Sequence, residues 1–93
     1  MLSSEQSRAA RGWLDWSQAE LAKRAHVSLS TVRDFEKGRR TPIVNNLDAL
    51  RRAIEAAGVQ LLFEGEEAKG ITIGDAIASD SRGTSAASGA SAP

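Results

Sequence analysis

The chain has 93 residues with no cysteine and a single histidine, and its 12 basic residues balance its 12 acidic residues. A chain this short builds only one small hydrophobic core, and the absence of cysteine excludes disulfides and thiolate metal sites. No apolar run reaches the roughly 18 residues that span a bilayer, and the polar N-terminus lacks the apolar stretch of a secretory signal, so we expect a cytoplasmic protein without a membrane segment.

Three segments differ in composition and charge. Residues 1–58 show helical periodicity and hold ten Lys or Arg against seven Asp or Glu, a net charge of +3. Residues 59–74 are rich in apolar and β-branched residues, and residues 75–93 are mostly Ser, Ala and Gly, as in a flexible tail. A basic first segment is compatible with nucleic-acid binding, although most runs of charge are solvated helix faces.

Capping residues predict the first two helices. Ser3 or Ser4 can cap a helix that ends near residues 12–14. Ser17 begins the second helix, where Ser17 and Glu20 are expected to form a reciprocal capping box. The residues that this second helix is expected to bury are Leu21, Ala22 and Ala25.

The third helix is predicted over residues 29–37, between a Ser28 cap and Gly38 in a left-handed cap, with Val32 and Phe35 directed inward.

After Pro42 a fourth helix is expected to begin at an Asn45 or Asn46 cap and to end near residues 57–58. Apolar residues recur at helical spacing along its predicted inner face. They are Ile43, Leu47, Leu50, Ile54 and Ala57.

Residues 59–74 predict a β-hairpin in which residues 65–70 form the turn. An isolated two-stranded hairpin is only marginally stable in water, so it must pack on the helices or pair with a second copy of the chain. The second possibility predicts a dimer contact through the alternating apolar residues, which are Val59, Leu61, Phe63, Ile71 and Ile73.

The only histidine, His26, lies between the second and third helices and is open to interpretation as a catalytic base, a metal ligand or part of a tight turn. Its motif contains no second ligand and no nucleophile, and the chain has neither a Gly-rich phosphate loop nor an H-E-x-x-H cluster. The short connection over residues 25–28, with apolar residues on both sides and the small Ala22, is typical of two helices that cross steeply. We therefore expect a turn, not an enzyme, and neither a cofactor nor a metal.

Three stretches carry a family resemblance: R-G-W-L-D-W-S-Q-A-E-L-A, V-S-L-S-T-V-R-D-F-E-K-G-R-R-T-P and N-N-L-D-A-L-R-R-A-I-E-A-A-G-V. Over about residues 5–58 the chain resembles the single-domain helix-turn-helix regulators of the phage-repressor and Cro type, the XRE family. The resemblance implies a mainly α, lambda-repressor-like domain of four helices over residues 1–58. The hairpin of residues 59–74 and the tail lie outside that common helical core.

In this family the third helix lies in the DNA major groove and reads bases from its N-terminal half. By position, Arg33 would contact guanine, Leu29 a thymine methyl, and Asp34 would accept from cytosine or orient Arg33. The base-reading residues implied by the resemblance are Leu29, Ser30, Thr31, Arg33 and Asp34. The alternative for Arg33 and Asp34 is an ordinary solvated helix surface.

The resemblance also implies phosphate contacts. Gln18 matches the residue that begins the second helix in such repressors and binds phosphate, and a helix N-terminus favours anions. Arg39, Arg40 and Thr41, after the third helix, would touch the flanking backbone, and Asn46 would do likewise. The alternative for each is a helix cap or a loop charge.

Other residues are interpreted as structural. Several family members pair an arginine late in the first helix with the glutamate that ends the recognition helix, which implies an Arg11–Glu36 pair. Trp13 and Trp16 are interpreted as packing residues.

The sequence departs from the family at two positions. His26 and Asp15 stand where the family commonly has glycine in a left-handed conformation. Both residue types tolerate positive φ comparatively well, so we expect both turns to be kept.

These features predict a sequence-specific transcriptional regulator, a repressor or autoregulator that binds a palindromic operator in double-stranded DNA as a homodimer. The alternative is an antitoxin that neutralises a toxin through its acidic and apolar C-terminal region and represses its own promoter. A toxin-like reading frame beside the gene would distinguish the two.

Overall fold

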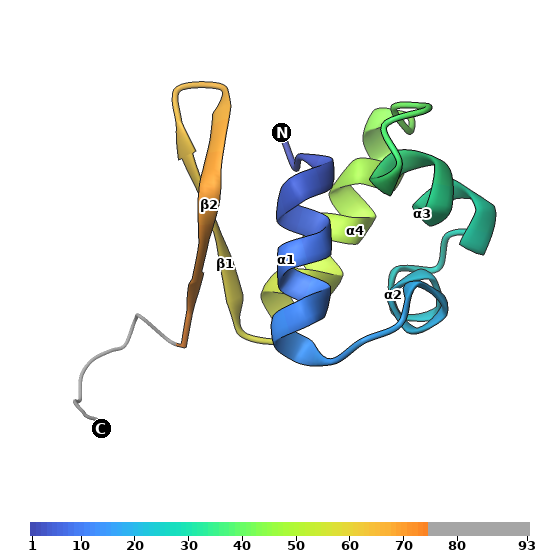
Figure 1. The fold of residues 1–93 in the computed structure, drawn as a ribbon, viewed down its shortest axis with the longest axis horizontal. Helices are drawn as coiled ribbons and strands as arrows, with labels where there is room; N and C mark the ends of the chain where they lie inside the picture. Colours follow the sequence, from blue (N-terminus) through green and yellow to red (C-terminus); the bar gives the residue numbers. More distant parts are fainter. Residues whose placement is uncertain (75–93) are drawn as a thin grey trace.

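The computed structural model describes residues 1–74, which form four α-helices followed by a β-hairpin (Figure 1). The elements are α1 (Ser4–Leu14), α2 (Gln18–Ala25), α3 (Leu29–Glu36), α4 (Val44–Ala56), β1 (Val59–Glu64) and β2 (Glu67–Ile73). This order confirms the mainly α fold class predicted from the sequence. The predicted flexible tail, residues 75–93, lies outside the described residues. Among the helices of residues 1–74, none has the length and apolar character needed to cross a membrane.

The reciprocal capping box lies at the start of α1 and not, as predicted, at the start of α2. The Ser3 hydroxyl accepts from the Gln6 N–H at 3.0 Å, and the Gln6 side-chain oxygen accepts from the Ser3 N–H at 3.1 Å. Ser17 does cap α2 by accepting the Glu20 N–H at 3.0 Å. The Glu20 carboxylate instead binds Arg24 at 2.7 Å, because a cation one turn later competes for it.

The predicted cap of α4 is wrong. The helix is preceded by Ile43 in an extended conformation and has no side-chain cap, so Asn45 and Asn46 both lie in its first turn. Pro42 restricts the chain before it, and the helix begins two residues beyond the proline. Ile43 therefore precedes the helix and is 68% exposed, contrary to its predicted place on the inner face.

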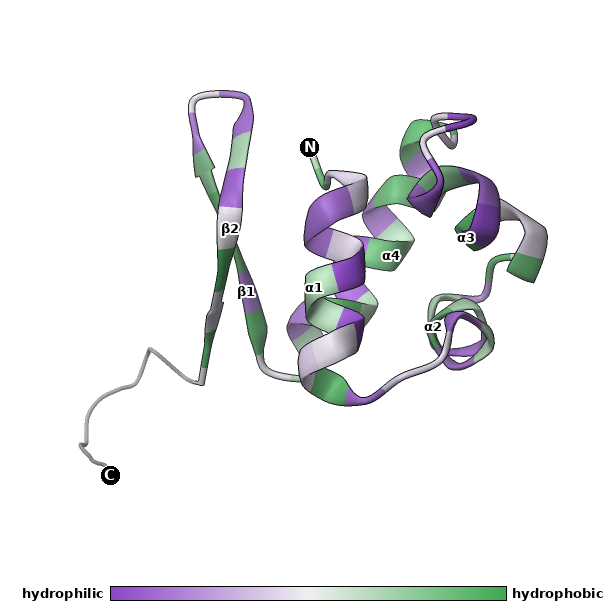
Figure 2. Ribbon diagram, in the orientation of Figure 1, coloured by the Kyte–Doolittle hydropathy of each residue, from purple (hydrophilic) through white to green (hydrophobic). Residues whose placement is uncertain are grey.

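The core lies between the four helices and the hairpin (Figure 2). Its fully or almost fully buried apolar residues are Leu2, Ala10, Leu21, Ala22, Ala25, Val32, Phe35, Leu47, Leu50, Ile54 and Val59. Trp16 packs against this core, and the guanidinium of Arg24 lies 4.4 Å from the centre of its ring. Trp13 is 62% exposed, so its interpretation as a packing residue is wrong.

The hairpin turn is much shorter than the predicted turn over residues 65–70. Only Gly65 and Glu66 separate the strands, because Gly65 adopts a left-handed φ of +62° that a two-residue turn needs. The following residues belong to β2, where a β-bulge accommodates Lys69 as an extra residue.

The hairpin packs on the helices of its own chain, β1 against α4 and β2 against α1. Val59 is fully buried, and Leu61 and Ile71 pack against the core. The side-chain amide of Gln6 donates to the carbonyl oxygens of Leu62 at 3.0 Å and Gly70 at 2.9 Å. Gln6 is 2% exposed, so its amide joins the start of α1 to both strands at a buried position.

Candidate nucleic-acid interface

The connection between α2 and α3 is a tight turn built on a left-handed histidine. His26 has φ +60° and ψ +40°, and the N–H of Val27 donates to the carbonyl of Ala22 at 3.0 Å. The His26 side chain is exposed, and no group of His, Cys, Asp or Glu in residues 1–74 is arranged to hold a metal ion. Asp15, at the end of α1, has φ +59°. The two residues that replace glycine thus keep the left-handed conformation.

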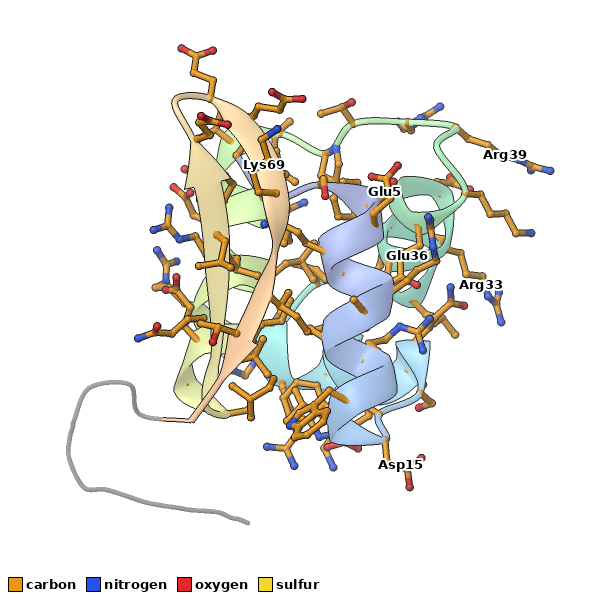
Figure 3. The ribbon with its side chains drawn as sticks, turned by 60° about the vertical axis from the view of Figure 1, so that its left-hand side comes forward. Glu5, Asp15, Arg33, Glu36, Arg39 and Lys69 are labelled. Atoms are coloured by element: carbon orange, nitrogen blue, oxygen red, sulfur yellow. The ribbon has the colours of Figure 1, made fainter. Side chains whose placement is uncertain are left out.

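The turn sets α3 with one face in the core and the other in solvent. Ser28 caps the helix by accepting the Thr31 N–H at 3.1 Å. Val32 and Phe35 are buried, whereas Ser30 and Arg33 are exposed. In Figure 3 the Arg33 side chain extends away from the hairpin, on the side that also carries Arg39. The outer face of α3 is therefore open to solvent and accessible to a ligand.

The predicted base-reading residues differ in how free they are. Ser30 and Arg33 are exposed and Asp34 is half-buried. The Thr31 hydroxyl lies 2.7 Å from that of Ser28, so it is engaged in the helix cap. Leu29 packs partly against the core. The Ser30 hydroxyl also lies near that of Ser28, at 3.2 Å, so Arg33 has the most freedom of the five to contact a ligand.

The loop after α3 is held close to the helix. The backbone N–H groups of Arg39 and Arg40 both donate to the Asp34 carbonyl, at 2.9 and 3.4 Å. Between this loop, α3 and the start of α4 lies a groove of about 230 Å³. It is lined by Ser30, Thr31, Asp34, Arg40, Thr41, Pro42, Ile43 and Asn46. The structure thus places Arg40, Thr41 and Asn46 beside the outer face of α3.

A buried polar network fixes the end of α3 to α1 and α2. Glu36 binds Arg11 through Nη2 at 2.7 Å and Nε at 3.0 Å, and it accepts from the Ser7 hydroxyl at 2.5 Å. The Gln18 amide donates to the same carboxylate at 3.1 Å. The side chain of Glu36 is 1% exposed and that of Arg11 is 20% exposed. The Arg11–Glu36 pair expected from the sequence is present, and Gln18 is attached to it.

The protonation state of this network follows from its geometry. Burial by itself raises the pKa of the Glu36 carboxyl, but the hydrogen bonds from Arg11, Ser7 and Gln18 and the charge of Arg11 together leave that pKa below its ordinary value. The hydrogen bond to Glu36 raises the pKa of Arg11. The pair is therefore ionised at neutral pH.

Sequence reasoning missed two residues that hold α3. Ser7 is fully buried against Glu36, and Arg8 donates from Nη1 to the main-chain carbonyl of Glu36. Ser7 and Arg11 are four residues apart, so both lie on one face of α1, and this spacing was a usable signal. For Arg8 the sequence held no such signal, because its partner is a backbone atom.

Two short helices joined by a left-handed turn, with the second exposed along its outer face, define a helix-turn-helix DNA-binding domain. The family model described as helix-turn-helix, that of the Cro/C1-type XRE regulators, matches residues 8–57. The match covers more than half of the chain, and the chain belongs to this family. It is a DNA-binding transcriptional regulator, from a family that acts by binding DNA and not by catalysis. No relative among the curated proteins matches the chain.

Proposed function

We propose that this regulator binds a palindromic operator as a homodimer and acts as a repressor or autoregulator. The observation that carries the proposal is the exposed outer face of α3, which is fixed to α1 and α2 through Glu36. A helix of eight residues contacts few base pairs, so a second copy would add both affinity and specificity. Two half-sites would then lie about one DNA turn apart, roughly 34–36 Å.

Within this proposal, Arg33 reads a base and Ser30 supports it. A guanidinium on an exposed helix face makes a bidentate contact with guanine, which is the commonest specific contact in the major groove. Asp34 lies one position further along, half-buried beside the groove, where it orients Arg33 or accepts from cytosine. Leu29 and Thr31 are the other proposed base-reading residues, and they contribute through the atoms left free by their packing and capping contacts.

The proposed phosphate contacts flank α3 on two sides. Gln18 stands at the N-terminus of α2, and only one of the two N–H groups of its amide is directed at Glu36. On the other side, Arg40, Thr41 and Asn46 line the groove between α3 and α4, and the exposed Arg39 precedes Arg40 in the loop. A DNA backbone crossing the domain would meet cations or polar N–H groups on both sides of the recognition helix.

Substitution of the two exposed arginines separates base reading from phosphate binding. After selection of bound sequences, Arg33→Ala should cost about 1–3 kcal/mol of binding and relax the preference at one base pair. Arg39→Ala should weaken binding to all sequences about equally and reduce the salt slope by about 1. An unchanged affinity and site preference for Arg33→Ala would refute the assignment of Arg33.

The hairpin is the proposed dimer contact, and its exposed residues carry that role. Val59 is fully buried within one chain, and Leu61 and Ile71 pack on its core. Deletion of the hairpin would therefore open the core and test folding instead of dimerisation. Ile73 remains 37% exposed and Phe63 half-buried, so these two of the predicted contacts are available to a second copy.

A point substitution in the hairpin tests the dimer without removing the core. Sedimentation equilibrium should show a dimer for the wild type and a monomer for Ile73→Asp, because a charge in an apolar contact is not tolerated. Val44→Asp is a matched control, since Val44 is also apolar and is 56% exposed at the start of α4. A monomer for Val44→Asp together with a dimer for Ile73→Asp would move the contact to α4.

A further inference from the structure

Most of the basic side chains of residues 1–74 that lack an acidic partner lie on α3 or in the loop after it. Of the 12 Lys and Arg residues in the chain, 11 lie in residues 1–74. Four of these form ion pairs: Arg11, Arg24, Arg51 and Lys69. Among the other seven, Arg33, Lys37, Arg39 and Arg40 lie on α3 or in the loop directly after it, and Lys23 and Arg52 lie on α2 and α4. The seventh is Arg8, in α1.

Arg8 is far from α3 in the sequence but is attached to it in the fold. Its Nη1 group donates to the main-chain carbonyl of Glu36, 28 residues later in the chain. Glu36 is the last residue of α3, and Lys37 follows it directly. The Arg8 guanidinium therefore lies at the end of α3, where the loop containing Arg39 and Arg40 begins.

The side chain of Arg8 has capacity beyond this one contact. A guanidinium carries five N–H donors, and the only hydrogen bond that Arg8 donates in residues 1–74 uses one of them. Arg8 is exposed, so the remaining donors are open to solvent. The bond to the Glu36 carbonyl also restricts the side chain before a ligand arrives, which lowers the entropic cost of a second contact.

Two structural explanations compete with a ligand contact. A cation at the C-terminus of a helix stabilises the helix dipole, and this alone would account for the bond to the Glu36 carbonyl. The second explanation is pairing with Glu5, the nearest acidic residue along α1, which lies one turn before Arg8. The pKa of the Glu5 carboxyl is lowered mainly by a hydrogen bond with its own backbone and only in a smaller part by the charge of Arg8. The two side chains form no ion pair. Neither explanation uses the remaining donors of Arg8.

We propose that Arg8 is a further phosphate-binding residue of the DNA interface. It adds a cation from α1 to the cations that α3 and the loop after it supply. The proposal rests on the proposed mode of DNA binding described above. It adds a fourth element, α1, to the phosphate contacts made by α2, by the loop after α3 and by α4. Arg8 contacts the DNA backbone and so adds affinity without sequence preference.

The salt dependence of DNA binding tests this role, with a short duplex of mixed sequence as the probe. Loss of one phosphate contact lowers the magnitude of the slope of log K against log salt by about 0.9. Arg8→Gln should show this loss, whereas Arg8→Lys should keep a slope close to that of the wild type, because it keeps the charge. Arg52→Gln is the matched control, since it removes one exposed, unpaired charge on α4.

The outcomes distinguish this inference from the proposal on which it depends. A wild-type slope for Arg8→Gln, whatever its melting temperature, would show that Arg8 only stabilises the end of α3. An equal loss of slope in Arg52→Gln would also overturn the assignment, because it would mean that net charge alone is measured. If Arg39→Ala lowers the slope and Arg8→Gln does not, only the role of Arg8 fails. If neither variant differs from the wild type, the proposed interface itself fails.

Discussion

Replacing Glu36 with glutamine is expected to lower the free energy of unfolding by about 3–5 kcal/mol, the range for removing one partner of a buried ion pair. Arg11 and Gln18 both donate to the carboxylate, so an amide N–H₂ in its place would face two donors. The charge of Arg11 would also lose its partner. For a domain of this size each kcal/mol corresponds to about 4–8 °C, so thermal unfolding followed by circular dichroism should show a clear drop in Tm.

The same substitution at an exposed ion pair provides the control. Arg51 and Glu55 form an i,i+4 pair at 3.0 Å, with side chains 48% and 39% exposed. Glu55→Gln should cost no more than about 1 kcal/mol, since solvent screens such pairs. Equal losses for Glu36→Gln and Glu55→Gln would mean that burial of the network contributes nothing to stability.

The effect of Glu36 should also depend on pH. The pKa of Glu36 is lowered in the folded protein. Its contribution to the free energy of unfolding is therefore fully present above about pH 4.3, the pKa of a glutamate in the unfolded chain, and is lost as pH falls through the pKa of the folded state. The difference in stability between the wild type and Glu36→Gln should therefore be largest at neutral pH and should narrow below pH of about 4. A difference that stays constant down to strongly acidic pH would contradict this account.

The second large effect is expected at Gln6. In Gln6→Glu the oxygen that accepts from the Ser3 N–H is retained, but the amide that donates to the carbonyls of Leu62 and Gly70 is replaced by a second oxygen. Each buried acceptor left without a donor costs about 1–3 kcal/mol, so the loss should reach about 3 kcal/mol in urea unfolding at pH 7. The cause is the detachment of the hairpin from α1.

Acidification and a neutral variant separate charge from shape at this position. A carboxyl buried against two carbonyls has a raised pKa in the folded state. The variant protein therefore keeps its stability below about pH 4.3, the pKa of the carboxyl in the unfolded chain, and loses stability as pH rises through the pKa of the folded state. The deficit of Gln6→Glu should therefore shrink as pH falls towards 4. Gln6→Met, which has a similar length and no charge, should show a deficit that does not change with pH. Wild-type stability of Gln6→Glu at pH 7 would refute the role of this contact.

Local signals allowed the recognition helix to be predicted closely from the sequence. Ser28 caps α3 as expected, and Gly38 has φ +76°, as a left-handed cap requires. Both ends depend on residues within a few positions of the helix. The family resemblance also led to the left-handed turn at His26 and to the pairing of Arg11 with Glu36.

Features that depend on distant parts of the chain could not be predicted in this way. Trp13 has helical spacing typical of a packing residue, but the position of the hairpin determines which face of α1 is covered, and Trp13 remains exposed. The apolar run of the hairpin was compatible with either its own core or a second copy. Its packing depends on Gln6, a polar residue that offers no hydrophobic signal. The contact between Arg8 and Glu36 could not be predicted from side-chain patterns either, because the acceptor is the main-chain carbonyl of Glu36.

The hydrogen bonds of Gln6 also bear on the order in which the chain folds. They join residues 56 and 64 positions apart, whereas the Arg11–Glu36 pair closes a segment of only 25. The entropic cost of closing a flexible loop rises with the length of the loop, by roughly 0.8 kcal/mol between these two separations. We therefore expect the helical core to nucleate from its short-range contacts, with docking of the hairpin as a late step on the folding pathway.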